Sequence, residues 1–185
     1  MIKSLIRCAA ISSTIAYSAA TAAAISVTSN AAPQGSVLTQ SQVFAGFGCS
    51  GQNISPDLTW SAGPEGTKSY AVTMYDPDAP TGSGWWHWVV YNLPASTLAL
   101  PAGAGSSDGK ALPAGAVQGK TDFGGPGFGG ACPPAGDKPH RYIVTVFALG
   151  TEKIDVPADS TGAMVRFMIH ANMLDKGNLT TTYSR

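Results

Sequence analysis

Three segments rich in β-branched and aromatic residues are the strongest constraint on the fold of this chain. They span residues 69–76, 85–93 and 140–149, and each has the length and composition of a β-strand. A shorter strand is expected at residues 179–183. The sequence contains 22 glycines and 13 prolines, which predict many turns rather than long helices. We therefore expect a mainly β single domain whose strands pack as a sandwich.

One helix is expected after the third of these segments, within residues 159–177. Asp159 or Ser160 has the side chain of a helix N-cap, and Gly177 can end a helix. The pattern predicts one C-terminal helix. The apolar residues that recur within it are Met164, Phe167, Met168 and Met173.

The first 24 residues have the layout of a secretory signal peptide. Lys3 and Arg7 precede an uncharged run of mostly Ala, Ser and Thr, and small residues follow. Cleavage is expected after Ala24, with Ala20 and Ala32 as alternatives. A retained membrane anchor is the competing interpretation, and the weak apolarity of the run argues against it. We therefore expect an exported protein, periplasmic or secreted, without a transmembrane span in its mature form.

Cleavage also changes the number of cysteines. Cys8 lies in the leader, so only Cys49 and Cys132 remain in the mature chain. Two cysteines in an exported protein most simply form one disulfide, and two separate buried thiols are the alternative. The mature chain is expected to begin with a flexible lead-in at residues 25–35, followed by the folded domain at residues 36–185.

Charge and composition exclude two classes of protein. The chain has 11 basic and 11 acidic residues and no basic block, so it lacks the electrostatic footprint of a nucleic-acid-binding protein. Hydrophobic residues make up 44% of the chain and charged residues 12%, which is too apolar for a disordered protein and sufficient for a core.

Polar residues lie at the ends of the three predicted long strands. Because side chains two apart in a strand share a face, His140 and Tyr142 should point the same way. His87 should share a face with Val89 and Tyr91 for the same reason. Polar groups at the ends of apolar strands often line a crevice. We expect one small pocket lined by Asp76, Asp78, His87, His140 and Tyr142.

Each of these residues also has a purely structural interpretation. The sequence Asp-Pro-Asp-Ala-Pro at residues 76–80 forms a good turn by itself, because Asp bonds nearby amides and Pro fixes φ. His87 among aromatic residues can be a buried core histidine, and Tyr142 is more often core than site. A chemical alternative is a metal-dependent hydrolase, since two Asp and two His could bind zinc.

Three motifs taken together resemble the phosphatidylethanolamine-binding protein family, in its bacterial Raf kinase inhibitor-like branch. They are DPDAP at residues 76–80, GWWHWVVYNLP at 84–94 and GGACPPAGDKPHRY at 129–142. The resemblance extends from about residue 44 to residue 183. It implies a β-sandwich of antiparallel sheets with short peripheral helices. It also implies a small pocket for a phosphate-like anion or a phospholipid headgroup, no catalysis and no cofactor.

The resemblance implies a set of ligand-binding residues and one unusual peptide bond. The bond between Ala79 and Pro80 is expected to be cis, as is typical of the family. Trp86 stands where animal members carry a second histidine, so their kinase regulation does not transfer. Inhibition of a protease or a host kinase by an exposed loop is a further hypothesis, without a named target. The implied ligand-binding residues are Asp76, Asp78, His87, His140, Tyr142 and Pro134, and the loop before His140 includes Cys132 and Pro133.

Overall fold

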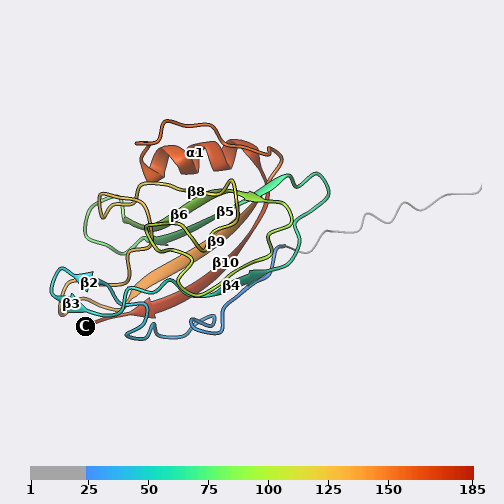
Figure 1. Cartoon of the computed structure of the whole chain (residues 1–185). Coiled ribbons are helices and arrows are strands. Elements are labelled where there is room, and N and C mark those ends of the chain that lie inside the picture. The colour runs from blue at the N-terminus through green and yellow to red at the C-terminus, as the bar shows by residue number, and fades with distance from the viewer. Residues whose placement is uncertain (1–23) are drawn as a thin grey trace, which may run out of the picture.

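The computed structural model describes residues 24–185, and its centre is an antiparallel five-stranded sheet (Figure 1). The strand order is β10-β9-β5-β6-β8. The three central strands coincide closely with the three apolar segments of the sequence. Their composition favours strands strongly, because β-branched and aromatic side chains fit a pleated surface that is buried on both faces. The strands are β5 (Ser69–Asp76), β6 (Trp85–Pro94), β8 (Val117–Gln118), β9 (His140–Leu149) and β10 (Met173–Tyr183).

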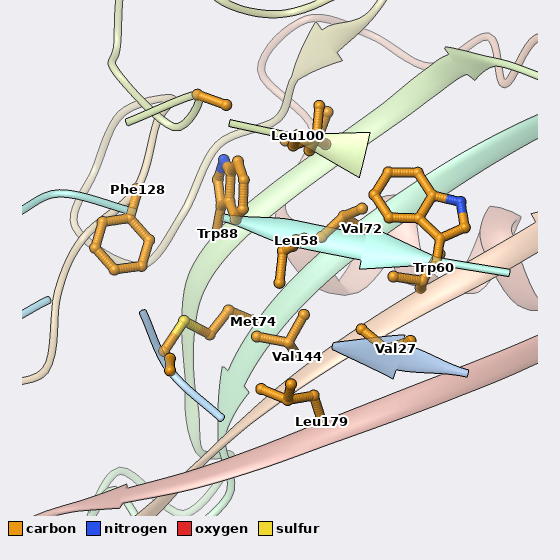
Figure 2. Packing of buried hydrophobic residues seen from close by; sticks show 14 of the residues in the cluster. Val27, Leu58, Trp60, Val72, Met74, Trp88, Leu100, Phe128, Val144 and Leu179 are labelled. Carbon is orange, nitrogen blue, oxygen red and sulfur yellow. The ribbon is translucent and has the colours of Figure 1, made fainter. Parts of the chain in front are cut away.

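A smaller sheet covers one face of the large sheet and encloses the main core. Its order is β1-β4-β7, and a separate hairpin joins β2 to β3. Figure 2 shows Leu58, Trp60 and Leu100 of the small sheet facing residues of the large sheet such as Val72 and Val144. The two packed sheets confirm the expected β-sandwich. The short strands are β1 (Val27–Thr28), β2 (Ala45–Gly46), β3 (Cys49–Ser50), β4 (Leu58–Trp60) and β7 (Ala99–Leu100).

A single described helix, α1 (Gly162–Asn172), covers the opposite face of the large sheet (Figure 1). Val165 and Ile169 are its buried apolar side chains. They belong to a second core cluster with Ala71, Val89 and Phe147 of the sheet. The sheet therefore separates two apolar layers, and side chains that alternate along a strand enter one layer or the other.

The predicted limits of the helix were wrong at both ends. Thr161, rather than Asp159 or Ser160, is the N-cap, and its hydroxyl accepts a hydrogen bond from the Met164 amide at 3.2 Å. The helix ends at Asn172, because the chain from Met173 onward pairs with β9 along its whole length. A strand ladder of this length outweighs the weak helical preference of the intervening residues. The expected terminal strand is therefore present but begins six residues earlier, at 173 rather than 179.

The expected flexible lead-in is packed into the fold. Ile25, Val27 and Ala32 are buried in the main core, and β1 pairs with β4. The Asp57 carboxylate accepts hydrogen bonds from the Asn30 and Ala31 amides at 3.1 and 2.9 Å. Period-two burial over only two or three residues is too short a signal to mark this segment as a strand.

The expected signal peptide lies outside the described residues, apart from Ala24. Among residues 24–185, no helix has the length and apolarity needed to cross a membrane.

Candidate functional site

A pocket of about 180 Å³ opens at one end of the large sheet, where β5 ends and β6 and β9 begin. The structure brings Asp76, His87, His140 and Tyr142 together around it. Pro134 also lines it, next to Cys132 and Pro133. The remaining walls are mostly apolar, formed by Phe47, Ala79, Pro80, Thr81, Trp85 and Phe123.

His87 reaches this pocket through a β-bulge. Met74 of β5 pairs with Trp88 of β6, but Tyr75 pairs with Trp86, so His87 has no partner across the strands. A bulge inserts one residue into a strand and re-aims its side chain. The expectation that His87 shares a face with Val89 was therefore wrong.

The side chains around His87 show the consequence of the bulge. The His87 ring lies 5.1 Å from the Tyr142 ring and 5.4 Å from the Phe123 ring, measured between centroids. Val89 and Tyr91 instead pack into the layer beneath α1. Strict alternation predicts the wrong face here because the bulge shifts the strand by one residue.

Asp76 and His140 form a buried ion pair at the base of the pocket. His140 Nδ1 lies 2.8 Å from Asp76 Oδ2, and His140 Nε2 lies 3.3 Å from Asp137 Oδ2. Burial alone would lower the pKa of His140, but its hydrogen bonds and charge attraction to Asp76 and Asp137 raise it overall. Both ring nitrogens of His140 donate to carboxylates. His140 therefore supports the pocket and has no free donor for a ligand.

The turn that follows β5 is organised by the second oxygen of Asp76. Asp76 Oδ1 accepts hydrogen bonds from the Asp78 and Ala79 amides at 2.8 and 3.1 Å. The Thr81 amide donates to the Ala79 carbonyl at 2.8 Å. The predicted cis bond before Pro80 was wrong, since every peptide bond within residues 24–185 is trans. The hydrogen bonds donated by these amides close the turn while the Ala79–Pro80 peptide bond is trans.

Asp78 points away from the pocket lining. Its carboxylate accepts hydrogen bonds from the Arg141 backbone amide at 2.9 Å and from Arg141 Nε and Nη2 at 2.8 Å each. The hydrogen bond to the Arg141 side chain is the main cause that lowers the pKa of Asp78 to about 2. Asp78 thus ties the turn after β5 to the start of β9. It contributes to the pocket by positioning Asp76 rather than by lining it.

The polar groups of the pocket lining that have no protein partner within residues 24–185 belong to His87 and Tyr142. His87 Nδ1 lies 2.7 Å from the Gly129 carbonyl oxygen, and because a carbonyl only accepts, Nδ1 carries the proton. Burial lowers the pKa of His87, so its ring is neutral and Nε2 is an acceptor. The Tyr142 hydroxyl is fully buried and has no hydrogen-bond partner among the described residues.

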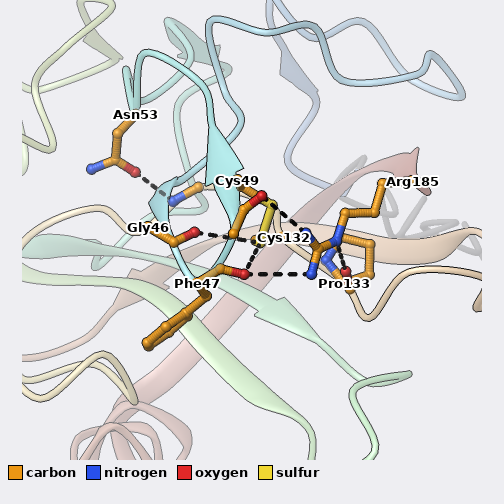
Figure 3. Close-up of a disulfide and its surroundings, with 9 residues drawn as sticks. Gly46, Phe47, Cys49, Asn53, Cys132, Pro133 and Arg185 are labelled. Atoms are coloured by element: carbon orange, nitrogen blue, oxygen red, sulfur yellow. Dashed lines mark hydrogen bonds between the residues drawn. A yellow bond between two sulfur atoms is a disulfide. The ribbon is translucent and has the colours of Figure 1, made fainter.

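Aromatic side chains and a disulfide form the rim of the pocket. The Cys49–Cys132 disulfide, which confirms the expected pairing, joins the end of the β2–β3 hairpin to the pocket wall (Figure 3). Arg185 Nε donates to the Pro133 carbonyl at 2.6 Å, and its Nη1 and Nη2 donate to the Gly48 and Phe47 carbonyls. The hairpin tip is therefore held at the pocket by a covalent bond and by Arg185, which makes two hydrogen bonds to the tip and one to Pro133.

Sequence reasoning did not find two of the rim residues, Phe47 and Phe123. Their rings stack at 5.9 Å between centroids, and the Phe44 ring lies 4.5 Å from that of Phe123. The available signal for Phe47 was an aromatic residue between two glycines, two positions before Cys49, in the segment Gly46–Phe47–Gly48. Such a residue sits at a turn tip, and Phe47 does adopt a positive φ of 52°.

The donor atoms of the site do not fit a zinc ion. His140 uses both nitrogens to hold carboxylates, and His87 uses Nδ1 to hold the Gly129 carbonyl. Within residues 24–185 no three His, Cys, Asp or Glu side chains are arranged to hold a metal ion. The structure thus does not favour the metal-dependent hydrolase hypothesis.

Comparison with known proteins assigns the family. The sequence profile described as phosphatidylethanolamine-binding protein matches residues 28–184 of this chain. The chain belongs to the phosphatidylethanolamine-binding protein family. It is 61% identical over 164 residues to the UPF0098 protein YbcL of Escherichia coli K12, covering 89% of this chain and 90% of YbcL. It is 53% identical over 156 residues to the UPF0098 protein YbhB of the same strain, covering 84% of this chain and 98% of YbhB.

Solved structures agree with this family assignment. The crystal structure of Escherichia coli YbcL, described as a new member of the mammalian PEBP family, matches with a TM-score of 0.86 at 60% identity. The match covers 88% of this chain and 99% of YbcL. The PEBP homolog CT736 of Chlamydia trachomatis matches with a TM-score of 0.72 at 29% identity, over 88% of this chain and 98% of CT736. The resemblance carried by the three sequence motifs is confirmed.

Proposed function

We propose that this protein is an exported binding protein whose pocket holds a phosphoryl group, either as free phosphate or in a phospholipid headgroup. The observation that carries the proposal is the buried, unpaired hydroxyl of Tyr142 in the pocket wall. A buried hydroxyl without a partner costs about 1 to 3 kcal/mol. A ligand oxygen that accepts its hydrogen bond would remove this cost.

The volume and charge of the pocket narrow the ligand class. A volume of about 180 Å³ suits a headgroup better than a drug-sized molecule, for which sites begin at roughly 300 Å³. Asp76 and His140 neutralise each other, and Asp137 adds a negative charge beside them. A doubly ionised phosphate would be repelled by this arrangement. The pocket therefore favours a singly charged phosphoryl group.

His87 supplies the second contact and links binding to a proton. Its unprotonated Nε2 can accept a hydrogen bond from a P–OH group of the ligand. A bound anion also favours the charged imidazole, so a phosphodiester without a P–OH would be held after His87 takes up a proton from solvent. In both cases binding takes up one proton. The complex holds this proton between His87 and the ligand, whereas neutral His87 and the fully ionised ligand hold none there when they are apart.

Export is supported by two independent features. The first 24 residues have the pattern of a signal peptide, and disulfides persist in oxidising compartments such as the periplasm. Inhibition of a partner protein stays a prediction, since no feature of the site selects a target.

The experiment is a calorimetric titration of inorganic phosphate and of glycerophosphoethanolamine at pH 6, with wild-type protein and the variant Tyr142→Phe. Loss of one hydrogen bond to a charged group should weaken binding about 10- to 100-fold. Tyr91→Phe is the matched control, because Tyr91 lies in the other apolar layer, beneath α1. Tyr142→Phe should not lower the thermal midpoint, because its hydroxyl makes no protein hydrogen bond.

The outcomes separate the possible ligands. Binding of inorganic phosphate alone indicates a free-phosphate site, whereas clearly tighter binding of glycerophosphoethanolamine indicates a headgroup site. Equal affinity of wild type and Tyr142→Phe for both probes, or no binding to wild type, would overturn the proposal.

A further inference from the structure

The backbone nitrogen of Ile25 meets a carboxylate from the opposite end of the chain. It lies 3.2 Å from Asp175 Oδ2, although the two residues are 150 positions apart. Asp175 is half-buried and follows an irregularity in the pairing of β10 with β9, between Met173 and Asp175. A carboxylate at such a bulge is directed at one chosen partner rather than along the ladder.

The packed part of the chain begins sharply at Ile25. The Ile25 side chain is buried in the main core, whereas Ala24 is exposed. Ser26 is held on both sides of its peptide unit, since its amide donates to Ser61 Oγ at 3.0 Å and its carbonyl accepts from the Ser61 amide at 3.1 Å. The Ile25 carbonyl packs so closely on Gly177 that a Cβ at residue 177 would collide with it.

We propose that signal processing cuts the peptide bond between Ala24 and Ile25, and that the new α-ammonium group of Ile25 forms an ion pair with Asp175. The cut is a hydrolysis. The water hydroxyl adds to the Ala24 carbonyl carbon, the C–N bond breaks, and the nitrogen of Ile25 takes up protons to become –NH₃⁺. Ala22 and Ala24 supply the small residues that a signal peptidase requires before the cut. The inference rests on the export part of the proposed function, and not on its ligand.

The two other possible cleavage positions fit the structure less well. Cleavage after Ala32 would remove β1 and the buried side chains of Ile25 and Val27 from the core. Cleavage after Ala20 would leave four residues ahead of Ile25, and the group facing Asp175 would stay an uncharged amide. Only a cut after Ala24 keeps the core complete and places a cation beside the carboxylate.

The ion pair should make the cleaved protein more stable than the uncleaved one. Before the cut, Asp175 receives one N–H from a neutral amide. After the cut it receives a charge-assisted hydrogen bond from an ammonium group, which is roughly twice as strong. Because the pair is half-buried, we expect it to lower the unfolding equilibrium constant by about three- to tenfold.

The first experiment is the intact mass of the protein exported from cells that express the full chain. The expected mass is that of residues 25–185 with the disulfide closed. A mass that corresponds to a start after Ala20 or Ala32, or to a retained leader, overturns the inference. A start after Ala20 or Ala32 would not by itself change the outcome of the phosphate titration on the exported protein. The processing proposal and the ligand proposal can therefore fail separately. A retained leader would also count against the export part of the proposed function.

The second experiment is a double-mutant cycle on urea unfolding. Residues 25–185 are compared with residues 24–185, each with Asp175 or with the variant Asp175→Asn, after release from a removable fusion. Retaining Ala24 should raise the unfolding equilibrium constant about three- to tenfold with Asp175 present and leave it unchanged with Asp175→Asn. Asp155→Asn is the control, since Asp155 is exposed and lies outside this contact. Equal effects of Ala24 on both backgrounds would refute the ion pair.

Discussion

Removal of the disulfide should cost this protein a large part of its stability. Cys49 and Cys132 are 83 positions apart, so the bond closes a long loop in the unfolded chain. The chain-entropy relation for a loop of this size corresponds to about 4.5 kcal/mol at 25 °C. Neither cysteine is fully buried, so exchange of both for alanine leaves no sizeable core cavity. The loss should therefore come almost entirely from the freed unfolded chain.

Native contacts restrict how far the hairpin can move when the disulfide is absent. Arg185 holds the Phe47, Gly48 and Pro133 carbonyls without help from the disulfide. We therefore expect Cys49→Ala/Cys132→Ala to fold, with its free energy of unfolding lower by roughly 2 to 4.5 kcal/mol. The pocket floor belongs to β5, β6 and β9, so the phosphate affinity of the folded variant should change by no more than about threefold.

The assay is urea unfolding followed by tryptophan fluorescence, for wild type with and without dithiothreitol and for the double variant. Reductant should shift the wild-type curve toward that of the variant and leave the variant unchanged. A loss below about 1 kcal/mol in both tests would refute the argument that the crosslink restricts the unfolded chain. Free-thiol labelling of the unfolded, unreduced wild type should detect no reactive cysteine.

Three further predictions follow from the geometry. Phosphate affinity should fall by up to about tenfold per pH unit between pH 6 and 8, because the shared proton at His87 is lost; a constant affinity in calorimetry would contradict this. The pKa of His140 is raised, so the stabilisation it provides is present below about pH 6.5 and lost as the pH rises through the raised pKa. The thermal midpoint should accordingly decline above pH 6.5 in wild type and less steeply in Asp76→Asn. Gly177→Ala should lower the unfolding free energy by about 1 to 3 kcal/mol in urea titrations, because the new Cβ would collide with the Ile25 carbonyl. Gly125→Ala is the control and should leave the unfolding free energy unchanged, because the space around Gly125 is open.

The long strands could be predicted from sequence because composition and periodicity agree over eight to ten residues. The limits of α1 could not, because residues 173–177 form a strand only through pairing with β9, which is a non-local contact. The same applies to residues 25–35, whose order depends on Asp57 and Asp175. Local patterns carry no information on such partners.

The structure brings four of the five expected residues to one pocket, Asp76, His87, His140 and Tyr142, and leaves Asp78 outside its lining. His140 and Tyr142 do share a face, as period two requires, and both line the pocket. His87 joins them only through the bulge, which no residue type at that position signals. Asp78 is drawn outward by Arg141, and the alternation of β9 already places Arg141 on the face opposite His140. Bulges and ion pairs across strands are thus the features that alternation alone misses.

The double use of Asp76 limits how this pocket can change. One carboxylate oxygen closes the turn after β5 and the other holds His140. A substitution of Asp76 that changed the polarity of the pocket floor would therefore also remove the hydrogen bonds that close the turn after β5. Phe123 and Trp85 on the rim make no such bond through their side chains among the described residues, so altered ligand preference is accessible there. Redesign for a different headgroup should begin at the mouth of the pocket and leave its base intact.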